Sequence, residues 1–421
     1  MEFVIRAARI VDSNSPHHTS TKDLLIKNGS IAQIEDEITF SGQEIKASGL
    51  KVSPGWVDMR AHYNDPGMEH KEDLETGCNA AASGGFTNVV LLPNTQPVVA
   101  SKNALGYYQK WNRHSIVQLH PTAAVTLNCD GKELTEMIDL HTAGAVAFTD
   151  GIEPIWHTDI LLKSLQYLQK FNGLLINRPE DKMLTAFGTM NEGIVSTRLG
   201  LKGMPALAEE VMIKRDLQLL EYTGGRIHFS LISTKGAVEL LKAAKSRGLK
   251  VTADVGIHHL LFTDEQMTTY DTHYKLNPPL RAAADRDALI AGVLDGTIDV
   301  IVSDHQPQDL ESKKLEYDLA EFGVIGQQSF YPALLSAFGD RSDEVLGRLT
   351  VNARAILGLE ATSVDVGAKA CLTLYSDELS WEYNKANNQS RSEASPFIGQ
   401  TLKGKVVGTV NNGELALNDH A

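Results

Sequence analysis

The residues best suited to chemistry in this chain begin in the stretch Ser53–Gly67, which contains Arg60, His62 and Asn64. The stretch starts with apolar residues and ends in an Asp-Pro-Gly turn, a pattern that predicts a buried strand. Side chains two residues apart on a strand lie on one face, so Arg60 and His62 share a side. If the strand lines a closed barrel, that face points to the centre, where catalytic groups gather.

Further polar residues stand at the ends of other short apolar runs. They are Asn94, Asp150, Arg178, His228, His258, His259, Asn277, Asp304, His305 and Gln308. Function in a barrel sits at the C-terminal ends of the strands, so we expect these residues to face one common site. Together they supply imidazole, carboxylate, amide and guanidinium groups.

Eight short apolar runs, separated by amphipathic helical patterns, have to position these groups. The runs are Val52–His62, Thr87–Asn94, Val117–Val125, Ala145–Asp150, Gly173–Glu180, Arg226–Ser233, Lys250–Leu260 and Ile298–Pro307. Repeated strand, helix and strand predicts an α/β fold with parallel strands and right-handed crossovers, hence a (β/α)8 barrel. An open, doubly wound sheet is the alternative for the same pattern.

Both ends of the chain are rich in strand patterns, whereas the middle alternates strand and helix. We expect residues 1–51 and 360–421 to pack together as one small β-sandwich beside a barrel of residues 52–359. The charged segment Asp309–Glu321, which follows the last barrel run, is expected to be a mobile loop.

The composition indicates an ordinary globular protein with an acidic surface. Its 421 residues include 53 acidic and 39 basic ones, for a formal charge of −14, without a Lys/Arg cluster. A nucleic-acid or membrane surface is therefore not expected. No run reaches the roughly 18 apolar residues of a membrane span, and no signal peptide is evident, which favours the cytoplasm. Cys78, Cys129 and Cys371 are too scattered for a disulfide framework.

Several of these stretches resemble motifs of the dihydroorotase family within the amidohydrolase superfamily. Ser53–Gly67 is similar to the family's Pro-Gly-Phe-Val-Asp-x-His-x-His-x-Arg-Asp-Pro-Gly. Pro93-Asn94-Thr95, His258-His259-Leu260, Asn277–Arg281 and Ser303-Asp304-His305 follow in the family's order and spacing. The resemblance covers nearly the whole chain. It implies an amidohydrolase barrel that reversibly hydrolyses dihydroorotate to N-carbamoyl-aspartate.

The resemblance also implies a metal site. Hydrolysis of a cyclic amide at neutral pH needs a metal-bound hydroxide, and the family holds one or two divalent metals, usually zinc. Family ligands come from two His on the first strand, an Asp on the fourth and a His each on the fifth and sixth. An Asp on the eighth strand shuttles the proton.

Carried over position by position, half of that metal site is substituted. His62, Asp150 and Asp304 are retained, and Asp304 would be the proton shuttle. Arg60, Arg178 and Leu231 stand where the family has His. Leu has no donor atom and Arg is always protonated, so neither can bind a dication. We expect instead that Arg60 and Arg178 supply the metal's positive charge and pair with Asp150 and Asp304.

The substrate-binding positions are altered as well. Asn64 replaces the family's carboxylate-binding Arg and Gln308 replaces a loop His, whereas Asn94 and Asn277 are retained. These four are the candidate substrate contacts. The remaining strand-end residues His228, His258, His259 and His305 are expected to be structural.

Three functions remain compatible with the sequence. The first is an inactive dihydroorotase homologue that acts as a structural or regulatory partner, with aspartate transcarbamoylase as the candidate and a homo-oligomer expected. The second is a working dihydroorotase or related cyclic amidase with one weakly bound metal on His62, Asp150 and Asp304. The third is a binding protein for an anionic small molecule, held by the two Arg and by Asn94 and Asn277.

Overall fold

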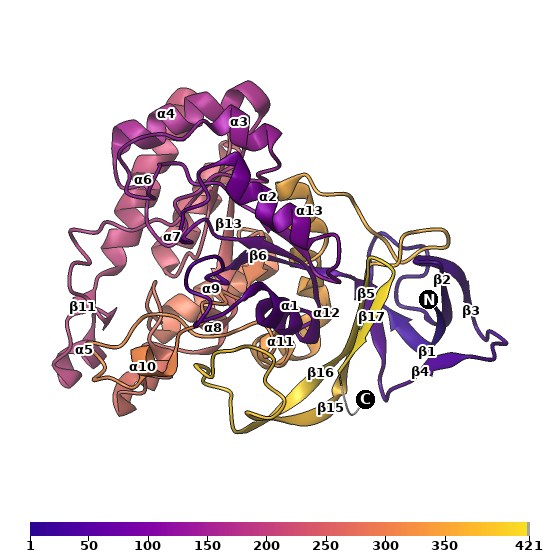
Figure 1. Cartoon of the computed structure of the whole chain (residues 1–421). Helices are drawn as coiled ribbons and strands as arrows, with labels where there is room; N and C mark the ends of the chain where they lie inside the picture. The colour runs from indigo at the N-terminus through magenta and orange to yellow at the C-terminus, as the bar shows by residue number, and fades with distance from the viewer. Residues whose placement is uncertain (419–421) are drawn as a thin grey trace.

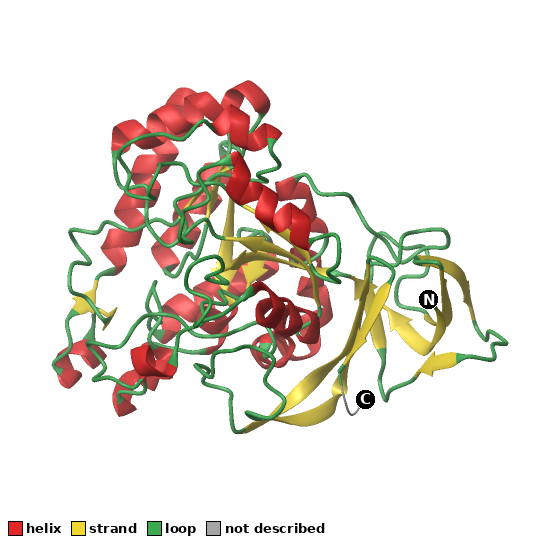
Figure 2. Cartoon of the chain, in the orientation of Figure 1, coloured by secondary structure: helices red, strands yellow, loops and turns green. Residues whose placement is uncertain are grey.

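The computed structural model describes residues 1–418 of the chain. Its central feature is a ring of parallel strands surrounded by helices (Figures 1 and 2). The barrel strands are β6 (Trp56–Ala61), β7 (Phe86–Leu91), β8 (Gln118–Pro121), β9 (Leu175–Asn177), β12 (Ile227–Phe229), β13 (Val251–Gly256) and β14 (Val300–Val302). The fourth position in the ring is held by single bridges of Phe148 to Ala123 and to Leu175.

Pairing between the first and last strands closes the ring. The strands β6, β7 and β8 form one parallel sheet, and β9, β12, β13 and β14 form a second in that order. A parallel bridge from Ala61 to His305 joins β6 to the end of β14. The predicted (β/α)8 barrel is therefore confirmed, and the open doubly wound alternative is wrong.

The helices and the short strands outside the barrel lie between these elements. The helices are α1 (Leu74–Ser83), α2 (Lys102–Trp111), α3 (Met137–Thr142), α4 (Thr158–Leu168), α5 (Ile194–Leu199), α6 (Ala206–Thr223), α7 (Lys235–Ser246), α8 (Ile257–Leu261), α9 (Ala283–Asp295), α10 (Leu310–Lys313), α11 (Phe330–Phe338), α12 (Ser342–Val345) and α13 (Val351–Leu357). A two-stranded ladder of β10 (Met190–Asn191) and β11 (Gly203–Met204) belongs to the loop that follows β9.

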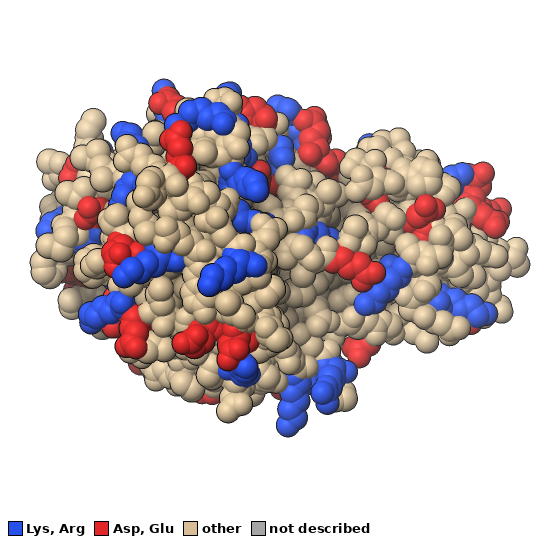
Figure 3. All heavy atoms as spheres, turned by 90° about the horizontal axis from the view of Figure 1, so that it is seen from above, with Lys and Arg blue, Asp and Glu red and all other residues tan. Residues whose placement is uncertain are grey.

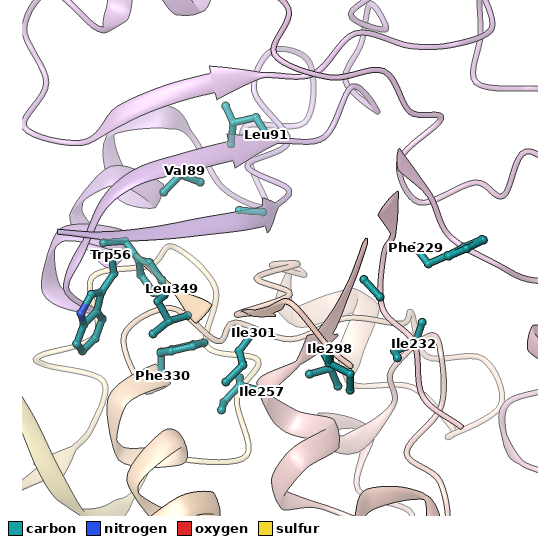
Figure 4. Close-up of a cluster of buried hydrophobic side chains, with 14 of the residues drawn as sticks. Trp56, Val89, Leu91, Phe229, Ile232, Ile257, Ile298, Ile301, Phe330 and Leu349 are labelled. Atoms are coloured by element: carbon teal, nitrogen blue, oxygen red, sulfur yellow. The ribbon is translucent and has the colours of Figure 1, made fainter. Parts of the chain in front are cut away.

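Alternate residues along the barrel strands belong to two different cores. Val90, Val300 and Val302 share an inner core with α13 residues, whereas Val89 and Ile301 pack outward in the main core. Figure 4 shows Val89 and Ile301 in that outer core with Trp56, Phe330 and other labelled residues. This period of two is the signature of strands buried on both faces. The barrel interior is thus a packed core and not a pore.

The two ends of the chain contribute strands to one sheet. Its strands are β1 (Glu2–Ile10), β2 (Thr21–Lys27), β3 (Ser30–Glu35), β4 (Gln43–Ile45), β5 (Lys51–Pro54), β15 (Leu372–Tyr383), β16 (Gln400–Asn411) and β17 (Glu414–Leu417). They make a continuous eight-stranded sheet in which β5 pairs with both β1 and β15. Residues of β1, β2, β5, β15 and β16 share a separate apolar core. This β domain lies to one side of the barrel (Figure 1).

The surface carries both signs of charge. On the face in Figure 3, Lys and Arg side chains are interspersed with Asp and Glu over barrel and β domain alike. Within residues 1–418, no helix is both long and apolar enough to cross a membrane.

The segment after β14 does not have the contacts of a mobile loop. This segment, residues 309–323, is here called the strap. The buried Lys275 ammonium donates to the carbonyl oxygens of Tyr317, Asp318 and Ala320 at 2.6, 3.1 and 2.6 Å. Lys313, also buried, donates to those of Glu321 and Gly323 at 2.9 and 3.0 Å. These contacts argue against a mobile loop, because Lys275 from another loop and Lys313 within the strap satisfy the strap's own carbonyl groups.

These contacts predict that Lys275 holds the strap in place. Lys275→Met keeps the apolar stem but leaves three carbonyl groups without their donor, at a cost of about 2–4 kcal/mol. Hydrogen exchange should accelerate across residues 309–323 and little elsewhere. Lys242→Met is the matched control, because Lys242 is exposed and pairs only with Asp295. Equal exchange in the two variants would contradict the assignment.

Candidate functional site

Arg60 lies where the carboxyl ends of several barrel strands converge. Its Nε donates to Oδ1 of Asp304 at 3.0 Å, and its side chain is only 3% exposed. The Nη1 group lies 3.5 Å from both the Gly151 carbonyl oxygen and the Ser230 hydroxyl. Asp304 follows β14, Gly151 follows the bridge residue Phe148, and Ser230 follows β12. Together with β6, which carries Arg60, four strand ends are therefore joined by one guanidinium. The strand carrying Arg60 has a register shift between Asp58 and Ala61, an irregularity of the kind that re-aims side chains.

The carboxyl group of Asp304 is shaped by burial and by Arg60. Burial raises its pKa to about 6, although the adjacent Arg60 guanidinium favours the charged form. Asp304 also has a φ of 47°, in the left-handed region. A non-glycine residue there is uncommon and is characteristic of functional positions. The expected pairing of Arg60 with Asp304 is confirmed.

Asp150 and His62 are each occupied by other partners. Asp150 accepts hydrogen bonds from the Thr126 backbone N–H and hydroxyl at 2.9 and 2.7 Å. Burial raises the Asp150 pKa to about 6. The Nε2 of His62 lies 2.8 Å from the carbonyl oxygen of Asn94, and burial lowers the His62 pKa to about 4. His62 is therefore a neutral ring that donates to a backbone carbonyl.

The residues present do not fit a metal ion. Within residues 1–418, no three His, Cys, Asp or Glu side chains are grouped so that they could hold one. In particular, His62, Asp150 and Asp304 do not come together as ligands, and Asp304 faces a guanidinium instead. A dication beside Arg60 would also be repelled.

Arg178 does not have the expected partner. Its Nε and Nη2 donate to the Ile152 carbonyl oxygen at 3.0 and 2.7 Å, and its Nη1 pairs with Glu180. The expectation that Arg178 pairs with Asp150 or Asp304 is wrong. Glu180 stands two residues further along the same stretch, and burial of both groups makes the nearest carboxylate the favoured counter-ion. The pKa of Glu180 is lowered overall: burial raises it, but the charge of Arg178 and the hydrogen bonds from Thr185, Arg178 and Asn277 together outweigh burial.

Leu231 extends the apolar inner core to the strand ends. It is 1% exposed and packs in the cluster that includes Val57, Met59 and Val302. Its backbone has a φ of 57°, and its N–H donates to Asp254 at 2.6 Å. A bulky apolar residue in the left-handed region is an outlier that the surrounding structure has to hold. The position therefore combines an unusual backbone with a side chain that has no metal-binding atom.

The four candidate substrate contacts are each bonded within the protein. The Asn94 side chain donates to the Asp150 carbonyl oxygen at 3.0 Å and accepts from the Ile152 N–H at 3.0 Å. Asn277 donates to Glu180 at 3.3 Å. Gln308 accepts from Lys71 at 2.7 Å and donates to the Phe322 carbonyl oxygen at 2.7 Å. Asn64 donates to the His62 carbonyl oxygen at 3.3 Å.

A small cavity remains beside Arg178, Glu180, Leu231 and Asn277. Its volume is about 10 Å³, close to the minimum that holds one water molecule, whereas ligand pockets usually measure roughly 300–1,000 Å³. Asn277 Oδ1 is buried here and has no hydrogen-bond partner among residues 1–418. The side chains at the strand ends are thus packed against each other, with no room here for a six-membered cyclic amide.

Two contributors to this packing were missed at the level of sequence. Glu180 neutralises Arg178, and the buried Arg281 donates to Asn191 and the Met204 carbonyl oxygen at 3.0 and 2.6 Å. Arg281 thereby ties the β10–β11 ladder to the barrel. The spacing Arg178-Pro179-Glu180 could have indicated the first pair, because the two side chains leave one strand end close together. No local sequence pattern indicates the contacts of Arg281.

The strand-end histidines are buried. His228 lies between Asp254 Oδ2 and the Thr252 hydroxyl at 2.9 and 2.8 Å. Neither ring nitrogen of His258 has a partner within residues 1–418, and burial lowers its pKa to about 3. His259 donates from Nε2 to the Pro278 carbonyl oxygen, 2.9 Å away. These contacts agree with structural roles.

Comparison with known proteins places this fold and site. The model for the family described as "Dihydro-orotase-like" matches residues 49–237. The chain is similar to dihydroorotases of Pelotomaculum thermopropionicum and Syntrophotalea carbinolica, at 40% and 38% identity. The first comparison covers 100% of this chain and 99% of the relative, and the second covers 99% of each.

Solved structures support the same fold. The L-hydantoinase (dihydropyrimidinase) of Arthrobacter aurescens has a TM-score of 0.86 at 22% identity, covering 100% of this chain and 97% of that one. A D-hydantoinase gives a TM-score of 0.83 at 20% identity, covering 100% and 96%. Barrel, β domain and strand-end site therefore define an amidohydrolase-type protein, a metal-dependent class. Within that class, the chain belongs to the dihydroorotase family.

The Arg60–Asp304 pair predicts a specific stability pattern. Arg60→Met leaves Asp304 buried without its counter-ion and should lower the free energy of unfolding by about 3–5 kcal/mol. Since loss of Arg60 raises the Asp304 pKa further, the loss should be larger at pH 8 than at pH 5. Arg60→Met/Asp304→Leu should recover most of the stability in chemical denaturation. Arg286→Met, which removes an ion pair to Asp287 on the surface, is the control; an equally small effect for Arg60→Met would refute the pattern.

His258 predicts part of the protein's sensitivity to acid. The unfolded ring takes up a proton near pH 6.5, but the folded ring stays neutral down to about pH 3. The unfolded state therefore binds more protons between these values, and stability falls as the pH falls. At pH 5 this single group costs about 2 kcal/mol relative to pH 7. The variant His258→Phe should show a correspondingly shallower decline in urea denaturation across that range; an unchanged slope would contradict the assignment.

Proposed function

We propose that this protein serves pyrimidine biosynthesis as a dihydroorotase homologue that does not itself hydrolyse dihydroorotate. Its role is structural or regulatory, exerted on another enzyme of the pathway, with aspartate transcarbamoylase as the first candidate. The observation that carries the proposal is the Arg60 guanidinium bonded to Asp304 at the barrel centre. This group supplies positive charge where the family's chemistry requires a metal with an open coordination position.

The chemistry of the reaction supports the proposal. An amide carbonyl is attacked by a hydroxide that a metal generates at neutral pH, and a carboxylate receives the proton. A guanidinium can stabilise negative charge, but it cannot lower the pKa of a bound water as a Lewis acid does. Asp304 is engaged with Arg60 and is 5% exposed, so it has no access to a substrate proton in this arrangement.

An active dihydroorotase with a remodelled site is the second candidate. It is favoured by the full-length similarity to curated dihydroorotases and by the retained His62, Asp150 and Asp304. The separate partners of these three side chains weigh against it. The anionic small-molecule binding function loses its main support, because both Arg side chains already pair with carboxylates.

Metal content and turnover test the proposal directly. After dialysis against zinc, elemental analysis should find no stoichiometric metal, and neither hydrolysis of dihydroorotate nor cyclisation of N-carbamoyl-aspartate should be detectable. The variant Arg60→His/Arg178→His/Leu231→His places three imidazoles at the family positions and should gain zinc, because neutral imidazoles are zinc ligands and the two repelling guanidinium groups are gone. About one zinc per wild-type chain together with turnover would overturn the proposal.

The partner role has its own measurement. Purified transcarbamoylase from the same organism should co-elute with the protein, and its substrate saturation curve should shift when the protein is added. Absence of both effects would remove transcarbamoylase as the partner, and the metal and turnover result would still decide between the active and the inactive reading.

A further inference from the structure

Three loops at the carboxyl ends of the barrel strands form one packed unit, here called the cap. It comprises residues 183–204 after β9, residues 264–276 after β13, and the strap after β14. Met190, Met267 and Tyr317, one from each loop, share a small apolar cluster. The Tyr270 hydroxyl donates to the Leu199 carbonyl oxygen at 2.9 Å. Figure 1 shows α5, β11 and α10 gathered at the end of the molecule away from the β domain.

The outer surface of the cap is unusually apolar. Met183, Phe187 and Ile194 are between 86% and 89% exposed, so most of the surface of these large side chains faces outward. The strap adds Leu310, Leu315 and Leu319, which are 46% to 63% exposed. Single exposed apolar residues are ordinary, but several on one packed unit indicate a surface that another molecule covers.

The strap is also acidic. It carries five carboxylates, and of its two lysines only Lys314 is exposed. The side chains of Glu311, Glu316, Asp318 and Glu321 make no hydrogen bond or ion pair within residues 1–418. Exposed carboxylates thus flank the exposed leucines along the strap sequence, an arrangement that complements a cationic surface.

Hydrogen bonds from two lysines hold the cap in one conformation, which favours docking of a partner over opening and closing of the barrel mouth. Lys275 and Lys313 fix the strap through five hydrogen bonds to its carbonyl groups. The Lys275 ammonium also lies 4.8 Å from the centre of the Phe322 ring. A loop already held in one conformation loses less entropy on association than a flexible one. Lys275 and Lys313 thus hold the segment that carries the exposed leucines in one conformation, as expected of a preformed binding surface.

We infer that the cap is the surface by which this protein docks onto a partner protein, through a partner groove that is apolar and bordered by Lys and Arg. The inference deepens the proposed function and rests on it, because an enzyme would need these loops to admit substrate. The barrel mouth beneath the cap is packed, so there is no substrate pocket for these loops to close over.

Other occupants fit the surface less well. A two-fold contact between copies of this chain would bring the acidic straps of both copies together, and like charges repel. The formal charge of −14 adds to that repulsion. An anionic membrane surface would be repelled in the same way. A cationic protein surface satisfies both the carboxylates and the leucines.

The probe for this surface is a fluorescein-labelled amphipathic helical peptide of Leu and Lys, with a Leu and Glu peptide as its counterpart. In fluorescence anisotropy the full-length protein should bind the first and not the second. Leu315→Ser/Leu319→Ser and Glu316→Gln/Asp318→Asn should each weaken binding by about tenfold, which corresponds to ~1.4 kcal/mol. Both pairs are exposed, so the variants should fold normally.

Matched controls lie on the β domain, away from the cap. Val366→Ser removes an exposed apolar residue, and Glu35→Gln/Glu37→Gln removes exposed carboxylates; neither should change peptide binding. Equal weakening by these controls, or equal binding of the Leu and Glu peptide, would overturn the inference. So would a fall in the mass of the protein alone, by light scattering, in Leu315→Ser/Leu319→Ser, because the cap would then join copies of the chain.

The same preparations separate this inference from the proposed function. Turnover of dihydroorotate by the wild type would overturn the proposed inactivity, whatever the peptide does. A wild type without turnover that binds the peptide no better than its cap variants would overturn the docking surface alone.

Discussion

The arrangement of this barrel depends on one ion pair, between the Arg60 guanidinium and the Asp304 carboxylate. A buried carboxylate needs either a counter-ion or a proton, and a metal centre normally supplies the charge in this class. Here the charge comes from a side chain on the first strand, and it reaches groups after three other strands. The guanidinium is planar, permanently charged and rich in donors, so it can bridge several strand ends at once.

With Arg60 at the barrel centre, the residues Arg178 and Leu231 at the other two substituted positions can be explained as well. A second cationic side chain, Arg178, is tolerable only with its own carboxylate, and Glu180 provides it. Leu231 removes a donor that would have no metal to bind and extends the inner core. Yet Asn64, Leu231 and Asp304 all have φ between 47° and 62°. Each of these backbone positions costs about 1–3 kcal/mol, which the surrounding packing has to offset.

The parts of the structure that follow from local pattern could be predicted from the sequence. The barrel follows from alternation of apolar runs and helices, and the pairing of Arg60 with Asp304 follows because the first and eighth strands must be neighbours in a closed ring. The partner of Arg178 could not be chosen in this way, since three carboxylates lie at nearby strand ends and packing decides among them. The strap was misjudged for a different reason: its composition is polar, but Lys275, from another loop, determines its order.

Access of substrate to the barrel mouth connects the structure of the site with the proposed role of the protein. A catalyst for a soluble substrate must alternate between admitting water and ligand and excluding them, which usually requires loops of low local stability. In this protein the loops at the mouth share a core, two buried lysines hold one of them, and Arg60, His62 and Asp304 beneath them are buried. Such stability is of little use to an enzyme that must open. It is an advantage to a protein that presents a fixed shape to another, because association then orders few groups and its free energy comes from the contacts themselves.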